Sequence, residues 1–358
     1  MNRYQEYWQN RNEKLFLKGE KDALSFAAGL KSNYNAAIKE IEKEINIFYG
    51  KYATIAQLDM IEIKKLLNST ELKSFKEYID EIIMYSKKAG MTKQYINQLK
   101  LLRLKSRISR LEELKTKMYF QLEKLNHDIT MGLGDTLGKI YENSYYRTIF
   151  NGQQFFNLSS SFTELNLKAI QKAISTPYML ENYSQVLWRN KESLKLILDK
   201  AIPQGIILGQ NPNKVAGIAA KKLDTNYKAT VRLVRTEYNL ILNDAAAQGY
   251  AECGIDRYQL LATLDRRTSD ICMEMDGQIF DLSKKEVGIN YPPFHPNCRT
   301  TTIAYFEPDE FDRNVKRIAR AENGKNYYVP GTLTYNQWYT GLTKQRDGTY
   351  VYKNKGGE

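Results

Sequence analysis

The chain is poor in cysteine, histidine and long apolar runs, and each scarcity limits what the protein does. Its 358 residues include three cysteines and two histidines. Three cysteines cannot build a disulfide framework, and a reducing compartment favours metal binding over disulfide formation. No apolar run approaches the roughly 20 residues that a membrane-spanning helix needs. The segment MNRYQEYWQNRNEKLF lacks the apolar core of a signal peptide. We therefore expect no membrane partner and a cytoplasmic site of synthesis.

Motifs of the common hydrolytic and phosphate-binding enzymes are also missing. The sequence contains no H-x-E with P-C-x-x-C, no H-E-x-x-H and no G-x-x-x-x-G-K-[ST], which are the patterns of zinc deaminases, metalloproteases and phosphate loops. Serine or cysteine hydrolysis needs a histidine base. His127 is expected at the surface of a basic helix, so His295 is the only histidine left that could act as such a base. Arg235 and Glu237 resemble an arginine and a glutamate of some transferases, but on a helix we expect them to form a packing ion pair. We predict a protein that is not an enzyme.

The positive charge is large and unevenly distributed. The net charge of +12 favours a polyanionic partner such as DNA, because a basic surface concentrates phosphates; the alternative is that the charge serves solubility alone. Residues 92–125 hold nine Lys/Arg and three Asp/Glu, an excess of six charges. A heptad pattern of apolar residues predicts one long helix here, beginning near Thr92. Its basic face is either the solvated face of a helical bundle or a surface turned toward DNA or an acidic partner. The candidate DNA-binding residues are Arg103, Arg107, Arg110 and Lys117.

The periodicity predicts a mainly α protein with a small α+β domain toward the carboxyl end. Apolar residues at three- and four-residue steps, from Tyr34 to Phe48, indicate a first helix that could end at Gly50. A second helix, rich in alanine, should stop at Gly254. Alternation favours short strands near residues 258–262, 278–281 and 300–305, and helical character resumes over 308–324. We divide the chain into an elongated helical domain (1–130), a connector (131–162), the α+β domain (163–323) and an aromatic, basic tail (324–358), which is either a docking arm or disordered.

Two of the three cysteines and one of the two histidines lie close together near the carboxyl end of this α+β domain. Cys272, His295 and Cys298 fall within 27 residues, and thiolate and imidazole are the side chains that hold zinc. His295 and Cys298 are three residues apart, so that a tight turn stiffened by Pro296 could bring both to one ion. A strand-turn-strand could bring Cys272 alongside them. The alternatives are two buried thiols, a disulfide formed after lysis, and a histidine that only forms a hydrogen bond in a turn.

An ordered set of segments resembles the phage head morphogenesis family, the Mu-F-like minor head proteins of tailed bacteriophages. The resemblance covers roughly residues 180–340, and its most specific pieces are an RTE helix, a T-x-D-x-R-T-x-x-x-C strand and turn, and HPNCR. The matching segments are YSQVLWRN, VAGIAAKKL, RLVRTEYNLILNDAAAQGYAECGI, ATLDRRTSDICMEMDGQIF, PPFHPNCRTTT and VPGTLTYNQWY.

The resemblance implies a structural role in the virion, inside the head at the portal vertex, with assembly in the host cytoplasm. The expected partners are the portal protein, a scaffold or major capsid protein, and DNA bound without sequence specificity. The amino-terminal helices would contact the portal. The alternatives are a metal-dependent nuclease or DNA-modifying toxin, and a DNA-binding protein that makes no portal contact.

The resemblance also bears on the zinc ligands. The aspartate of the T-x-D-x-R-T motif corresponds to Asp265, which becomes the first candidate for a fourth ligand, followed by Cys253 and a water molecule. Asp265 could instead pair with Arg267 or Arg299. Family members often have another cysteine directly after HPNCR, where this chain has Thr300.

Overall fold

The computed structural model divides into two compact units, each built from separate stretches of the chain. The first unit combines Met1–Ala27, Leu133–Tyr183 and Val231–Glu358, and the second combines Ala28–Gly132 and Ser184–Thr230. These units do not coincide with the four consecutive domains expected from the sequence. The structure describes residues 3–52, 59–156, 164–178, 180–306, 316–321, 325–330, 333–345 and 350–352.

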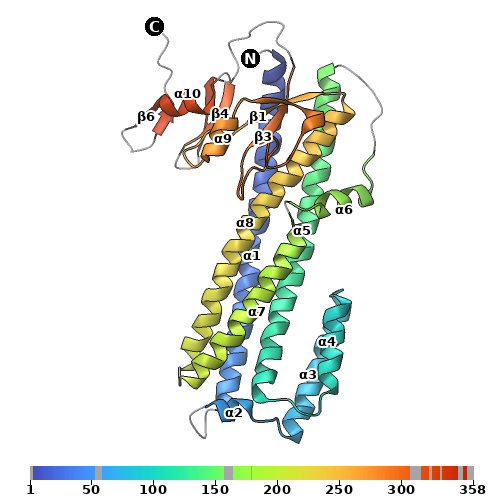
Figure 1. Ribbon diagram of the computed structural model, residues 1–358, viewed down its shortest axis with the longest axis vertical. Helices are drawn as coiled ribbons and strands as arrows, with labels where there is room; N and C mark the ends of the chain where they lie inside the picture. The colour runs from blue at the N-terminus through green and yellow to red at the C-terminus, as the bar shows by residue number, and fades with distance from the viewer. Residues whose placement is uncertain are drawn as a thin grey trace. The chain divides into compact units, whose positions relative to one another are not determined.

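Long helices dominate both units, as the periodicity predicted (Figure 1). Three of them contribute residues to both units: α1 (Arg3–Tyr52), α5 (Arg110–Phe156) and α8 (Pro212–Glu252). In the first of these, the residues of the predicted apolar stripe are buried or half-buried from Tyr34 through Phe48. The shorter helices are α2 (Met60–Lys64), α3 (Ser69–Lys88), α4 (Lys93–Leu104), α6 (Leu167–Ser175), α7 (Tyr183–Ile207), α9 (Asp270–Met275) and α10 (Tyr335–Thr340).

Two predictions about the long helices are wrong. The single helix expected over 92–125 is interrupted, because α4 ends at Leu104 and α5 begins at Arg110. Thr92 does cap α4, since its hydroxyl accepts a hydrogen bond from the Tyr95 amide. The connector expected over 131–162 is helical as far as Phe156, and residues 157–163 lie outside the described part of the chain. The glycines between residues 132 and 152 do not break α5. At Gly134 and Gly152 the missing side chain leaves room for Tyr183 and Cys253.

The second unit is held together by apolar residues and by paired charges. Side chains of α3 and α4 form most of one buried cluster that includes Phe75, Ile79 and Leu99, and Phe120 of α5 packs against it. In the same unit, the Tyr34 hydroxyl bonds to Thr230 Oγ1 at 2.8 Å. Lys191 Nζ lies 2.7 Å from Glu123 Oε2. Burial of such ion pairs orients the helices, because each partner would be left uncompensated if the other moved away.

The first unit contains the antiparallel sheet that the sequence predicted. Its order is β2-β1-β3, built from β1 (Arg257–Leu261), β2 (Ile279–Asp281) and β3 (Thr301–Ala304). Gly254 adopts φ +67°, which L side chains rarely take, and so ends α8 and turns the chain into β1. The sheet packs on α1 and α8 around Trp8, Tyr250 and Tyr258, all of which are fully buried. Asn12 Nδ2 donates to the Thr302 carbonyl at 2.8 Å, which ties α1 to β3.

The carboxyl-terminal part of the first unit is more ordered than the sequence indicated. Residues 316–320 form β4 (Lys316–Arg320), so the helix predicted over 308–324 is wrong there, and residues 307–315 lie outside the description. The strand β4 pairs with β5 (Asn326–Pro330), and β6 (Leu342–Lys344) pairs with β7 (Tyr350–Tyr352). Tyr335 and Trp338 are buried with Leu264 and Val329. The described part of the tail is therefore folded onto the α+β region and is neither a free arm nor disordered.

Within the described residues, no helix is both long and apolar enough to cross a lipid bilayer. The helices instead alternate buried and exposed positions along their length.

Candidate functional site

The His-Pro-Asn-Cys segment forms a tight turn that places its first and last side chains together. The Cys298 amide donates to the His295 carbonyl at 3.1 Å, which closes the turn. Asn297 has φ 64°, and asparagine tolerates this left-handed conformation better than most residues. Pro296 occupies the position before Asn297 and restricts the backbone there, as in a type II turn. The turn is also anchored to α8, because the Asn297 amide donates to Thr236 Oγ1 at 3.1 Å.

The third member of the cluster comes from α9, which follows β1 in the chain. Cys272 Sγ lies 3.2 Å from His295 Nε2 and 3.7 Å from Cys298 Sγ. One ligand atom from each of the three residues falls within 4.8 Å of the others. Two thiolates bonded to one zinc at about 2.3 Å with tetrahedral angles would be roughly 3.8 Å apart. The spacing of the sulfur atoms therefore fits a tetrahedral metal.

The imidazole of His295 is oriented as a metal ligand would be. Nδ1 lies 2.9 Å from the Pro296 carbonyl oxygen, and because a carbonyl only accepts hydrogen bonds, Nδ1 carries the proton in the neutral ring. Nε2 then presents its lone pair toward Cys272 Sγ and toward Ser269 Oγ, which is 2.7 Å away. A backbone carbonyl on the far nitrogen is the usual partner of a zinc-bound histidine.

The two thiols of the cluster are coupled and buried. Cys272 is 2% exposed and Cys298 1% exposed. A hydrogen bond from the Cys272 thiol, opposed by burial, lowers the pKa of Cys298 to about 6. The same hydrogen bond, together with burial, raises the pKa of Cys272. One thiolate is thus favoured even without a metal, and a bound cation would favour the second.

Asp265 and Cys253 lie outside this group. Both oxygens of the Asp265 carboxylate contact the guanidinium group of Arg299, one of them at 2.7 Å. Burial would raise the pKa of Asp265, but hydrogen bonds and the charge of Arg299 outweigh it and lower the pKa. Asp265 therefore forms an ion pair with Arg299, which was the alternative to metal binding. Cys253 Sγ lies 3.8 Å from the carbonyl of Ile149, and burial raises its pKa to about 11.

Two hydroxyl residues of the site were not identified as candidates from the sequence. Ser269, at the amino end of α9, faces His295 as described above. Thr300 is 1% exposed. Its side chain lies close enough to the two sulfur atoms to lower the pKa of Cys272 and of Cys298. Comparing the segment after HPNCR with the family draws attention to Thr300. Ser269, directly after the T-x-D-x-R-T motif, carries no recognisable signal in the sequence.

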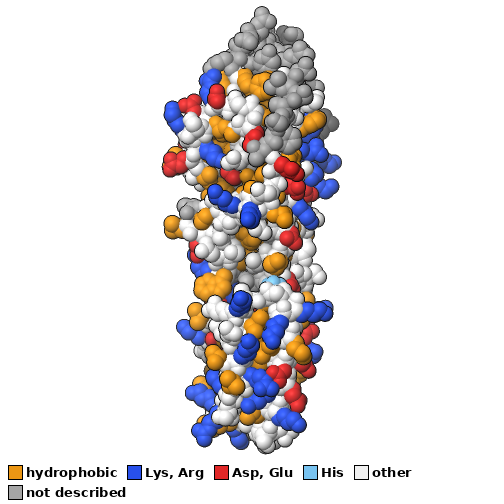
Figure 2. Space-filling view, turned by 90° about the vertical axis from the view of Figure 1, so that its right-hand side faces the viewer, with side chains coloured by type: hydrophobic (Ala, Val, Ile, Leu, Met, Phe, Trp, Pro, Cys, Tyr) orange, Lys and Arg blue, Asp and Glu red, His pale blue; other side chains and the backbone are white. Residues whose placement is uncertain are grey.

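The four predicted DNA-binding residues do not form one free basic face. Arg103 pairs with Asp80, Arg110 Nη1 lies 2.7 Å from Glu62, and Lys117 is paired with two glutamates. The side chains of Arg110 and Lys117 are each 16% exposed. Arg107 is exposed between α4 and α5. On the face that Figure 2 presents, Lys and Arg side chains are interspersed with Asp and Glu.

The ion pair predicted between Arg235 and Glu237 does not form. Side chains two residues apart on a helix project from different faces. Arg235 is exposed, whereas Glu237 is 2% exposed. Oε2 of Glu237 has no hydrogen-bond partner among the described residues, and burial raises the pKa of this carboxyl to about 8.

A comparison with protein families confirms the resemblance for the segment that contains the cluster. Residues 197–303 match the family described as Phage Mu protein F like protein. The match covers the end of α7, all of α8, the β2-β1-β3 sheet and the three cluster residues. This segment of the chain is Mu-F-like.

Two curated relatives are more distant. One is the NAD(+)--arginine ADP-ribosyltransferase EFV of Enterococcus faecalis, 22% identical over 220 residues, which are 58% of this chain and 44% of that protein. The other is an uncharacterized protein of Haemophilus influenzae, 27% identical over 144 residues, which are 38% of this chain and 32% of that protein. The chain thus spans less than half the length of either relative. No solved structure matches it.

Proposed function

We propose that the protein is a minor head protein of a tailed phage or prophage, with a structural and assembly role inside the head at the portal vertex. The observation that carries this proposal is the Mu-F-like match over residues 197–303. The absence of catalytic motifs from the sequence supports a role that is not enzymatic. Under this proposal, the portal protein and a scaffold or major capsid protein are the partners.

The cysteine and histidine cluster then acts as a structural zinc site. Cys272, His295 and Cys298 would hold the ion, which would supply a cross-link and no reaction. The cross-link would join α9 to the turn before β3, two elements separated by 23 residues in the chain, as the positions of Cys272 and His295 show. Cys272 and Cys298 belong to the core that also contains Tyr258 and Ile303. Structural sites are usually closed, with four protein ligands, and Thr300 faces the corner that a fourth ligand would fill.

Contact with DNA remains part of the proposal, but not through a single face of residues 92–125. Three of the four candidates hold acidic partners in the second unit. Arg107 alone would contribute a weak, salt-sensitive contact, because each neutralised phosphate contributes little by itself.

The rival function is a metal-dependent nuclease or DNA-modifying toxin. One observation favours it: His295 lines an open pocket of about 520 Å³, so a metal at the cluster would lie near solvent. The transferase activity in the name of the Enterococcus faecalis relative belongs to that protein, of which the chain spans 44%.

The test of the head-protein proposal is the location of the protein in particles. Heads of the phage that encodes the chain are purified, and their proteins are identified by mass spectrometry; co-purification with the portal oligomer is measured in parallel. We expect a low, constant copy number that follows the portal. Absence from purified heads would contradict the proposal, and chelator-sensitive cleavage of DNA that His295→Ala abolishes would favour the nuclease.

A further inference from the structure

We propose that a basic pocket in the first unit binds a phosphate group. The pocket lies beside the His295–Cys298 turn and has a volume of about 520 Å³, which is in the range of small-ligand sites. Its walls include four arginines, which come from α8, from the segment before α9, from the segment before β3 and from β4. These four arginines are Arg235, Arg267, Arg299 and Arg320.

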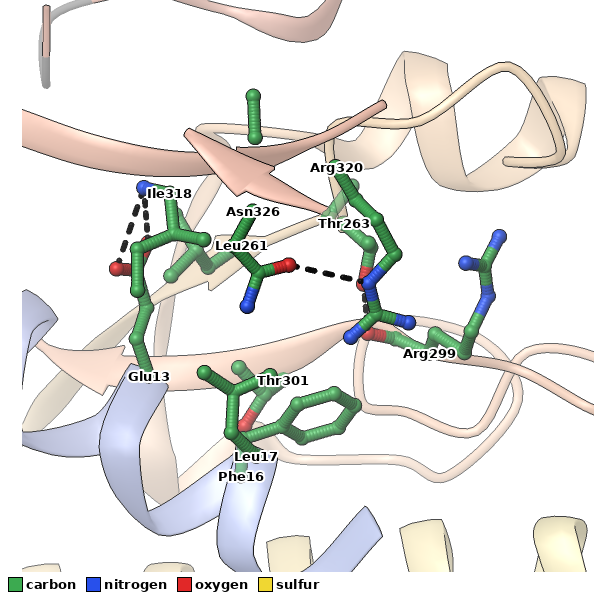
Figure 3. A pocket seen from close by; sticks show the side chains of 12 residues that line it. Glu13, Phe16, Leu17, Leu261, Thr263, Arg299, Thr301, Ile318, Arg320 and Asn326 are labelled. Atoms are coloured by element: carbon green, nitrogen blue, oxygen red, sulfur yellow. Dashed lines mark hydrogen bonds between the residues drawn. The ribbon is translucent and has the colours of Figure 1, made fainter. Parts of the chain in front are cut away.

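Two of the arginines are fixed in place by carboxylates. Arg299 is held by both oxygens of Asp265, and Arg320 Nη2 lies 2.8 Å from Glu20 Oε2. Their side chains are 18% and 17% exposed. Figure 3 shows both arginines at one end of the adjoining smaller pocket, on the side away from Glu13. These two guanidinium groups therefore form a rigid part of the wall.

The other two arginines are available to a ligand. Arg235 is exposed and takes no part in an ion pair within the described residues. The side chain of Arg267 is 74% exposed and lies 3.6 Å from the already paired Asp265. Four guanidinium groups thus stand against two carboxylates, Asp265 and Glu20, and against the Cys298 thiolate, which leaves a formal excess of one positive charge. A phosphate monoester carries about −1.5 to −2 charges at neutral pH and a backbone phosphate carries one, so both are opposite in sign to the pocket.

A buried hydroxyl on the same wall lacks a partner. Tyr238 is 2% exposed, and its hydroxyl has no hydrogen-bond partner in the described structure. Burial raises the pKa of Tyr238 well above its ordinary value, so the group stays an O–H donor. An unpaired buried donor costs free energy, and a phosphate oxygen that approached this hydroxyl would accept its hydrogen bond. Guanidinium groups and a fixed donor together form the usual setting for phosphate recognition.

The phosphate could belong to free phosphate, to a DNA end or to the DNA backbone, and guanidinium groups bind the oxygens of all three. The pocket is also lined by His295 and Cys298 of the metal cluster. The contacts to phosphate are assigned to the arginines and to Tyr238, none of which is a proposed metal ligand, so the inference does not require zinc or the head-protein role. A failure here would leave both of those proposals in place.

The experiment measures binding of three probes to the full chain at about 50 mM salt, where phosphate contacts are strong. The probes are inorganic phosphate, by calorimetry, and one fluorescent oligonucleotide with and without a 5′-phosphate, by anisotropy. The variants are Arg235→Gln with Arg267→Gln, and Tyr238→Phe. The control is Lys221→Gln with Lys222→Gln, which removes two exposed positive charges of α8 that belong to the second unit.

We expect the double variant to lose about tenfold to a hundredfold in affinity, because each charge-assisted hydrogen bond contributes strongly. Tyr238→Phe should lose less, and Lys221→Gln with Lys222→Gln should bind like the wild type. A preference for the 5′-phosphate would identify a DNA end, equal binding of both oligonucleotides would identify the backbone, and binding of phosphate alone a small ligand. Equal affinity of the wild type and the double variant, or no binding of any probe, would overturn the proposal.

Discussion

Replacing Glu237 by glutamine should stabilise the protein at alkaline pH and leave its stability at acidic pH almost unchanged. Glu237 lies on α8, is 2% exposed and has one carboxyl oxygen without a partner. Burial raises its pKa from 4.5 to about 8. The folded protein therefore keeps a neutral carboxylic acid over a pH range in which the unfolded chain has already lost the proton.

The sign follows from proton binding in the two states. Between about pH 4.5 and pH 8 the folded state binds more protons than the unfolded state, so the free energy of unfolding falls as the pH rises. The contribution is fully present below pH 4.5 and is lost by the time the pH passes 8. A pKa shift of this size changes the free energy of unfolding by something on the order of 5 kcal/mol. Glutamine imitates the protonated acid at every pH and removes this dependence.

The assay is urea-induced unfolding of the wild type and Glu237→Gln at about pH 5.5 and about pH 9. The difference between the two proteins should grow by several kcal/mol toward the higher pH, in favour of the variant. Other titrating groups are shared by both proteins and cancel from this difference. Glu274→Gln, which changes an exposed glutamate of α9, serves as the control. Parallel stability curves for the wild type and Glu237→Gln would refute the reasoning.

Three further predictions concern the ion pairs and the metal site. Asp265→Asn should lower the free energy of unfolding by about 3 kcal/mol, because Arg299 loses its partner, while the metal content stays unchanged; a loss of metal would show instead that Asp265 is a ligand. Thr300→Cys should bind zinc more tightly than the wild type in a chelator competition, because a third thiolate would complete a closed site; equal affinity would contradict the placement of Thr300 toward the sulfurs. Lys117→Met should destabilise the protein by about 3 kcal/mol, because Glu44 and a second glutamate lose their partner. The same variant should bind DNA as the wild type does. Weaker DNA binding with unchanged stability would instead support the basic DNA-binding face predicted from the sequence.

The metal cluster was predictable because the residues that form it lie within a short stretch of the sequence. His295 and Cys298 belong to one turn, and the short strands β1 and β3 were readable from alternation, so that the three ligands could be placed together. The partner of Asp265 was not decidable from the sequence, because nothing local shows that Arg299, 34 residues away, approaches Asp265 more closely than Arg267 does. Burial and approach geometry, which are tertiary properties, select Arg299.

Charge patterning was a poorer guide than residue spacing. The basic residues of 92–125 suggested one surface, but several of their acidic partners lie far away in the chain. Glu62 and Glu44 are examples, and no local pattern shows that they pair with Arg110 and Lys117. The glycines of residues 132–152 were misread as a connector, because glycine within a helix also permits close helix packing. That the four arginines line one pocket was not predictable, since four separate segments supply them.

Metal analysis of the purified protein tests the central claim, a structural zinc site in a head protein, most directly. The zinc content of the wild type and Cys298→Ser is measured by mass spectrometry, and the melting temperature is recorded before and after chelation. The account predicts one zinc per chain in the wild type and none in Cys298→Ser. It also predicts a lower melting temperature once the metal is removed. A wild-type protein that is purified without metal, binds none when zinc is added and melts at the same temperature with or without chelator would contradict it.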